Sequence, residues 1–90
     1  INNRVNFLQE YKFYFFGAHF PLYYFLSAGL SEKNILGVID NDPNKQNKRM
    51  YGLNIFTHNP IDIPAGSNVC VDMGPYTDEI KRNLQGYNFI

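Results

Sequence analysis

The chain has 90 residues, which is enough for one domain with a core of modest size. Its eight basic and eight acidic side chains give a formal net charge of zero. No stretch gathers Lys and Arg on one face, which argues against nucleic acid as a partner, because that binding depends on clustered positive charge. The sequence starts with Ile and ends on an apolar segment, and we expect residues 1–90 to be a single domain excised from a longer protein.

The apolar pattern argues against a membrane protein. The most apolar stretch, residues 13–30, is interrupted by His19, Pro21 and several tyrosines, and it lacks the roughly twenty consecutive apolar residues of a membrane span. No signal-peptide pattern is visible. Cys70 is the only cysteine, which leaves no internal disulfide or cysteine metal cluster. These features together predict a cytoplasmic protein.

The first elements are a helix and a strand. Residues 4–11 have apolar side chains at near-helical spacing, and Asn2 or Asn3 could cap that helix by accepting a hydrogen bond from a free backbone N–H. Phe13–Phe16 is a continuous aromatic run that ends at Gly17. A run without alternation is typical of a strand covered on both faces, and therefore favours a parallel sheet.

A second helix and a second strand follow. Residues 20–28 are apolar almost all round, Pro21 suits a first helical turn and Gly29 suits a left-handed stop, so we expect a buried or interface helix. Ile35–Ile39 is rich in β-forming residues and ends at residues 40–43, Asp-Asn-Asp-Pro, whose side chains favour a turn.

The second half of the chain continues the alternation. Residues 53–57 alternate weakly and predict an edge-like strand, and residues 68–72 predict a short buried strand. Thr77 is expected to cap a helix with acidic residues in its first turn, and residues 87–90 enter a last strand. Strands alternating with helices predict an α/β fold, a small Rossmann-like, mostly parallel sheet of four to five strands with helices on both faces.

Three loops are expected to meet beyond the carboxyl ends of the strands, where ligands bind in open parallel sheets. They are Gly17-Ala18-His19, Asp40-Asn41-Asp42 and Met73-Gly74-Pro75. A glycine at the end of the first strand lets the backbone approach a ligand, although a tight strand-to-helix turn explains it equally well.

Asp40 lies 23 residues after Gly17, which is close to the spacing at which a nucleotide-binding unit places a carboxylate on a ribose hydroxyl. The alternative is that Asp40 and Asp42 cap their own turn. Only one glycine of the dinucleotide fingerprint is present, and Phe20 and Pro21 would crowd a pyrophosphate, so tight NAD binding is not expected.

The two histidines and the cysteine are the side chains whose chemistry could serve catalysis or metal binding. His19 is the candidate for ligand contact or acid–base chemistry because it stands at a helix start, where a neutral ring is favoured; the alternative is a residue that only begins the helix. His58 is expected to be loop structure, and the two histidines lack zinc-site spacing, so no metal is predicted. Cys70, in a buried strand, is not expected to be a nucleophile.

The aromatic side chains of residues 11–25 offer more apolar area than a small core readily hides. Some of this area is expected to face a neighbouring domain of the same chain or a second copy. The alternative is an unusually aromatic core.

Three segments, FYFFGAHFP, ILGVIDNDPNKQNKRMYGLNIF and NVCVDMGPYTDEIKRNLQGYNFI, resemble the Rossmann-like C-terminal domain of bacterial sugar methyltransferases. More distantly, they resemble the N-terminal domain of sugar-nucleotide acyltransferases. The shared features are a strand ending in a Gly-Ala turn, D-[DN]-[DN]-P-x-K at residues 40–45, G-x-x-[IV] at 52–55 and E-I at 79–80. The resemblance covers residues 12–90, and His19-Phe20-Pro21 departs from the small or polar residues expected after the turn.

The resemblance implies an accessory domain that holds a nucleotide-linked sugar for a sugar-modifying enzyme, most directly a methyltransferase. This domain would not be catalytic by itself and would bind no cofactor, while S-adenosylmethionine would belong to another domain. Combined with the three loops, it gives a predicted ligand groove of Gly17, Ala18, His19, Asp40, Asn41, Asp42, Lys45 and Gly74. The alternative is a non-catalytic docking or dimerisation module that uses the aromatic helix at residues 20–26.

Overall fold

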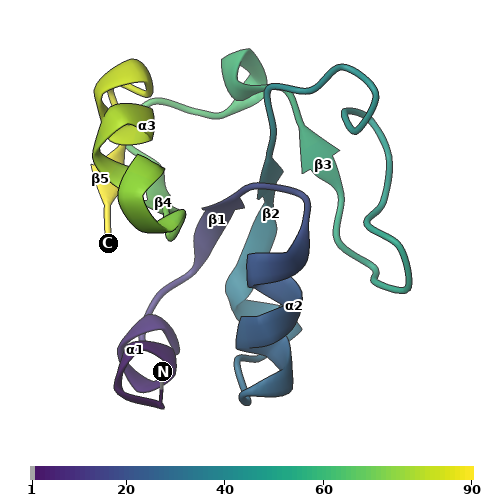
Figure 1. Ribbon diagram of the computed structural model, residues 1–90, viewed down its shortest axis with the longest axis vertical. Coiled ribbons are helices and arrows are strands. Elements are labelled where there is room, and N and C mark those ends of the chain that lie inside the picture. The colour runs from purple at the N-terminus through teal and green to yellow at the C-terminus, as the bar shows by residue number, and fades with distance from the viewer. Residues whose placement is uncertain (1) are drawn as a thin grey trace.

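The computed structural model describes residues 2–90 and confirms the predicted Rossmann-like α/β architecture (Figure 1). The sheet has five strands, which are β1 (Phe13–Phe16), β2 (Ile35–Ile39), β3 (Thr57–His58), β4 (Asn68–Cys70) and β5 (Asn88–Phe89). The helices are α1 (Asn2–Leu8), α2 (Phe20–Ser27) and α3 (Thr77–Asn83), with short 3₁₀ turns at Glu32–Asn34, Pro60–Asp62 and Gly74–Tyr76. None of the helices described in residues 2–90 is long and apolar enough to cross a membrane.

All strand pairs are parallel, and the order across the sheet is β3-β2-β1-β4-β5. The chain builds outward from β1 through β2 to β3, then returns to the other side of β1 for β4 and β5. The strand order therefore reverses between β1 and β4. In open α/β sheets, ligands bind at the carboxyl ends of the strands beside such a reversal.

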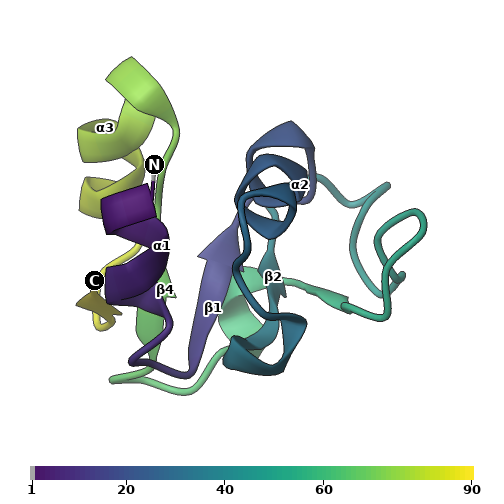
Figure 2. The ribbon, with the colours of Figure 1, turned by 90° about the horizontal axis from the view of Figure 1, so that it is seen from below.

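Helices cover both faces of the sheet. Phe13 and Phe15 belong to one buried cluster and Phe16 to another, because successive side chains of a strand point to opposite faces. The first cluster contains buried residues of α1 and α2, whereas Ile80 and Leu84, in and just after α3, pack in the second. Both ribbon views place α2 beside β1 and β2 and α3 beside β4 and β5 (Figures 1 and 2).

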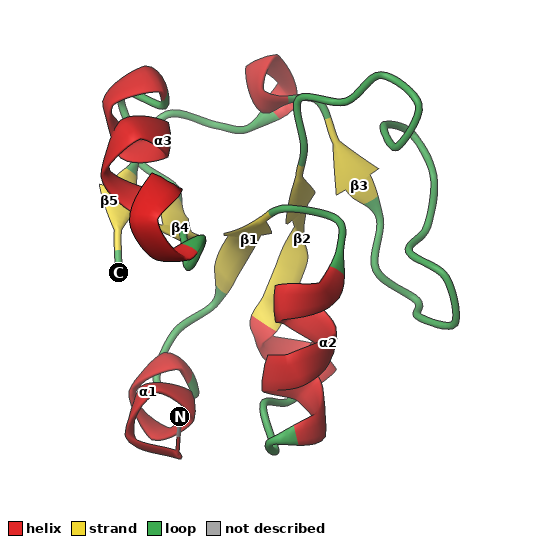
Figure 3. Ribbon diagram, in the orientation of Figure 1, coloured by secondary structure: helices red, strands yellow, loops and turns green. Residues whose placement is uncertain are grey.

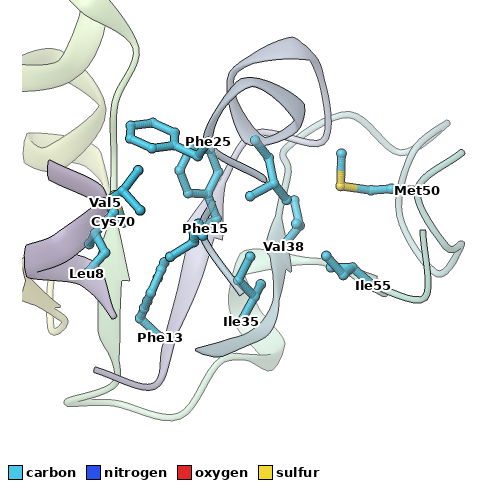
Figure 4. Packing of buried hydrophobic residues seen from close by; sticks show 12 residues of the cluster. Val5, Leu8, Phe13, Phe15, Phe25, Ile35, Val38, Met50, Ile55 and Cys70 are labelled. Atoms are coloured by element: carbon cyan, nitrogen blue, oxygen red, sulfur yellow. The ribbon is translucent and has the colours of Figure 1, made fainter. Parts of the chain in front are cut away.

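The first cluster is the larger part of the core. Phe13 and Phe15 are fully buried, and the ring of Phe15 meets Phe25 of α2 edge-on with 5.7 Å between ring centroids. Figure 4 shows these rings within the cluster. Met50 and Ile55, which belong to the loop that follows β2, extend the cluster toward that loop. Apolar burial on this scale is the main stabilising contribution to a domain of this size.

The bounds of β1 and β2 agree with the sequence analysis, whereas other elements differ. The helix α1 runs from Asn2 to Leu8 and ends before Tyr11, so Asn2 and Asn3 lie inside it and do not precede it as caps. The helix predicted at residues 20–28 is α2, and it ends at Ser27 as the chain turns through Gly29 with a φ of +108°.

The edge strand β3 is shorter than the predicted strand at residues 53–57. It holds only Thr57 and His58, so the expectation that His58 lies in a loop is wrong, whereas the edge position of the strand is as expected. Residues 47–56 fold back antiparallel to one another, with a bridge between Arg49 and Phe56 and a 2.9 Å bond from the Met50 N–H to the Ile55 carbonyl. Residues 53–55 therefore lie outside the parallel ladder, which β2 and this segment begin with the 2.9 Å bond from the Val38 N–H to the Phe56 carbonyl.

Two features of the second half of the chain also differ from the sequence prediction. The helix α3 begins at Thr77, but the side chain of Thr77 does not cap it: its Oγ1 accepts a 2.9 Å hydrogen bond from the Met73 N–H and so closes the 3₁₀ turn before the helix. The strand β4 ends at Cys70, two residues before the predicted end at Asp72.

Candidate functional site

The loops that follow β1 and β2 meet through the side chain of Asp40. Its Oδ2 accepts a 2.9 Å hydrogen bond from the Ala18 N–H, and its Oδ1 accepts a 2.8 Å bond from the Asp42 N–H. The predicted convergence of these two loops is therefore present. Asp40 links them with both carboxylate oxygens, as the capping alternative requires, and a contact with ribose stays a prediction.

Gly17 and His19 form a tight turn before α2. Gly17 has a φ of +102°, and a Cβ placed on it would lie 2.6 Å from Cε1 of His19, so both conformation and space favour glycine here. The imidazole of His19 folds back over the glycine, and its buried Nδ1 has no hydrogen-bond partner within residues 2–90. His19 occupies the N-cap position of α2 without a capping side-chain bond.

The remaining predicted ligand residues are placed in different surroundings. Asn41 is exposed, and Asp42 caps the following turn, since its Oδ1 accepts a 2.9 Å bond from the Asn44 N–H. Gly74 begins the 3₁₀ turn after β4 with a φ of +58° and lines neither of the two pockets described below. Of the predicted groove residues, Ala18 and Lys45 share a pocket.

That pocket, here called the basic pocket, has a volume of about 220 Å³ and lies between α2 and the loop that joins β2 to β3. Three of its side chains are basic and none is acidic, so an anion would be attracted to it. It is lined by Ala18, Tyr23, Asn44, Lys45, Lys48, Arg49, Met50, Tyr51 and Thr57.

The wall of the basic pocket is held by hydrogen bonds over the folded-back loop. The Thr57 N–H donates to the Lys48 carbonyl, and the Asn47 N–H donates to the Thr57 carbonyl, both at 2.8 Å. The hydroxyl of Tyr23 donates a 2.6 Å bond to the Tyr51 carbonyl, which ties α2 to the loop. These bonds bring the backbone of the loop against β3 and α2, and its basic side chains line the space between them.

Sequence reasoning named Ala18 and Lys45 but missed most of this lining. Lys48 and Arg49 have no role in the sequence prediction, and Tyr23 belongs there only to the expected buried or interface helix at residues 20–28. The signal that could have found them is the spacing of three basic residues within residues 45–49, directly after the Asp-rich turn.

A second pocket, here called the aromatic crevice, has a volume of about 250 Å³ and lies on another face of α2. It is lined by residues of α2 and by Asp72, which follows β4. Because α2 follows β1, the crevice lies between the ends of β1 and β4, where the strand order reverses. Phe20 is 74% exposed, and its ring centroid lies 6.4 Å from that of Tyr24. Phe20 and Pro21 thus form a wall of this crevice. Its lining is Phe20, Pro21, Tyr24, Phe25 and Asp72.

Cys70 lies in the core. Burial raises the pKa of its thiol to about 11, and the nearby guanidinium of Arg4, whose Nη2 lies 3.4 Å from Sγ, only partly opposes the effect. A thiol of this kind is protonated at neutral pH and is a poor nucleophile. In the part of the chain that the structure describes, no three His, Cys, Asp or Glu side chains are grouped so as to hold a metal ion.

Comparisons of the chain with protein-family models, with curated proteins and with solved structures give no match. What is shown is the fold: a small α/β domain with a five-stranded, all-parallel sheet. At the carboxyl edge of that sheet, two pockets of opposite character flank one helix.

Proposed function

We propose that this domain binds a nucleotide-linked sugar through its diphosphate, as an accessory domain of a sugar-modifying enzyme, most directly a methyltransferase. The observation that supports the proposal is the basic pocket, which combines Lys45, Lys48 and Arg49 with no acidic side chain at a pocket beside α2. The resemblance of residues 12–90 to the sugar methyltransferase domain agrees with this assignment.

The chemistry of the lining suits a diphosphate. Lysine ammonium groups and an arginine guanidinium form charge-assisted hydrogen bonds to phosphate oxygens, and arginine can bind two oxygens at once. The ring of Tyr51, which is 93% exposed at the rim of the pocket, adds surface outside it on which the base of the nucleotide can pack. In this proposal S-adenosylmethionine belongs to another domain, because three cations in one pocket repel its positively charged sulfonium.

Isothermal titration calorimetry with UDP-glucose, dTDP-glucose and GDP-mannose, and with the three free diphosphates, tests this proposal. We expect binding that weakens as salt rises, and a loss of about tenfold or more when Lys48 and Arg49 are both replaced by Ala. The matched control is Arg82→Ala, an exposed basic residue of α3. A folded protein that binds none of the six compounds would contradict the proposal.

A second candidate function is docking through the aromatic helix, either on a neighbouring domain or on a second copy. It is favoured by the exposure of Phe20 and Tyr24, at 74% and 50%, on successive turns of α2. Light scattering over a range of concentrations tests the second-copy form: dimerisation should be lost in Phe20→Ser. A chain that stays monomeric at high concentration would argue against it.

A further inference from the structure

The two pockets lie on different faces of the same helix. Consecutive residues of α2 separate them, since Tyr23 lines the basic pocket and Tyr24 lines the aromatic crevice. Both pockets also include residues that directly follow a strand or its turn, Ala18 after β1 and Asp72 after β4. A ligand that reaches from one pocket to the other would cross the start of α2.

The aromatic crevice differs from its neighbour in chemistry. Four of its five lining residues are aromatic or proline, namely Phe20, Pro21, Tyr24 and Phe25, and its single charged side chain is the carboxylate of Asp72. A carboxylate accepts hydrogen bonds and donates none, and it repels phosphate. The crevice therefore suits a group with an apolar face and several hydroxyl donors, and it disfavours the diphosphate that the basic pocket attracts.

We infer that the aromatic crevice holds the sugar ring of the nucleotide-linked sugar, an assignment that rests on the proposed function of the basic pocket. The C–H face of a hexose packs on the exposed ring of Phe20, as apolar surface packs on aromatic rings in general. Its hydroxyls donate to the Asp72 carboxylate in charge-assisted hydrogen bonds.

The size of the two pockets agrees with a ligand bound in two parts. Pockets for drug-sized ligands measure about 300–1,000 Å³. At about 220 and 250 Å³, each pocket is below that range and suits one fragment, a diphosphate group in the first and a single ring in the second. In a nucleotide-linked sugar these two groups are neighbours, because the anomeric carbon of the sugar is bonded through an oxygen to the outer phosphate of the diphosphate.

The experiment compares each nucleotide sugar with its own diphosphate by calorimetry, using dTDP-glucose with dTDP, UDP-glucose with UDP and GDP-mannose with GDP. For at least one pair we expect the nucleotide sugar to bind about tenfold more tightly, as one charge-assisted hydrogen bond would give. Phe20→Ala and Asp72→Asn should each remove most of that advantage and change the affinity for the diphosphate less than twofold. The matched controls are Tyr76→Ala and Asp78→Asn, both at exposed positions outside the crevice.

A second measurement needs no variant. In NMR spectra of the unmodified chain, the nucleotide sugar should shift the amide signals of Phe20, of residues 22–25 and of Asp72. The diphosphate should shift mainly the amide signals of residues 44–51. Equal affinity for sugar and diphosphate in every pair, or variants that weaken both alike, would overturn the crevice assignment and leave the basic pocket in place. If neither class of compound binds, both proposals fail.

Discussion

Residues 13–39, the β1–α2–β2 unit, and residues 40–56, the connection to β3, are built on different principles. The unit consists of regular elements joined by short turns and held together by buried aromatic and aliphatic side chains. The connection has neither helix nor strand, as Figure 3 shows. It is anchored in the core by the buried Met50 and Ile55 and by the partly buried Leu53. Both regions contribute to the basic pocket. We therefore expect the unit to contribute most of the stability of the domain, while the connection supplies the three basic side chains of the basic pocket.

The largest effect should come from the unit. Phe15→Ala removes a fully buried ring and leaves a cavity beside Phe25, at a cost of about 3–5 kcal/mol in the free energy of unfolding. Met50→Ala, in the connection, should cost about 2 kcal/mol, because the loop around it can close over the space. Urea unfolding measures both values. Equal losses would remove the distinction between the two regions.

Alkaline pH should weaken the core around the unit. Cys70 of β4 pairs with Phe15 and packs in the same cluster, and burial raises its pKa to about 11. The unfolded chain loses the thiol proton near pH 9 while the folded chain keeps it, so stability is complete below about pH 9 and falls as pH rises toward 11. The loss should be about 2–3 kcal/mol.

Unfolding measured from pH 8 to 11 on the unmodified chain and on Cys70→Ala checks this expectation. The two proteins differ only at residue 70, so the difference between the two curves isolates the thiol. A difference that stays constant with pH would contradict the effect of burial on Cys70.

Gly37→Ala tests the boundary between the two regions. A Cβ at Gly37 would lie 2.7 Å from the ring of His58 and 3.3 Å from the carbonyl oxygen of Phe56, so the new methyl would push the end of the connection away from β2. We expect a loss of about 1–3 kcal/mol. The same substitution in a His58→Ala background should cost much less, and equal costs would show that the ring is not the obstacle.

Asp40→Ala breaks the link between the loops of the two regions. The amides of Ala18 and Asp42 lose their acceptor, which should cost about 1–2 kcal/mol and speed hydrogen exchange at both amides. Asn41→Ala is the matched control, since its side chain is exposed in the same loop. Unchanged exchange at Ala18 in Asp40→Ala would show that the turn holds without the carboxylate.

Tyr23→Phe should have the smallest effect. It removes the 2.6 Å bond to the Tyr51 carbonyl near the surface, at a cost of about 0.5–1 kcal/mol. The loop should then open more often, which faster hydrogen exchange of the Met50 amide would report. Tyr24→Phe, at the next residue of α2, changes the aromatic crevice and should leave the exchange rate of the Met50 amide unchanged. Equal exchange rates of the Met50 amide in the two variants would mean that the Tyr23 hydroxyl does not hold the connection.

The sequence predicted the unit better than the connection. The bounds of β1 and β2 follow directly from two uninterrupted apolar runs, each ended by turn-forming residues. The shortened β3 depends on bonds between residues 47–50 and 55–57, which no local pattern announces.

The sequence also predicted only part of the candidate site. The meeting of Ala18 with Asp40 follows from parallel strands ending at one edge. The places of Lys48 and Arg49 depend on the fold-back of the connection, and the position of Phe20 as a wall depends on how α2 is rotated, which neither periodicity nor composition determines.

The bond from the Ala18 amide to Asp40 also bears on how such a domain can change its ligand. Because an internal carboxylate already occupies this backbone donor, the proposed recognition at the basic pocket would fall mainly to side chains of residues 44–51. Substitutions of the exposed Lys48 and Arg49 would alter the charge and shape of the pocket without changing a buried side chain. A family of domains built on this plan could therefore diversify its ligands through one surface loop while every member keeps the same scaffold.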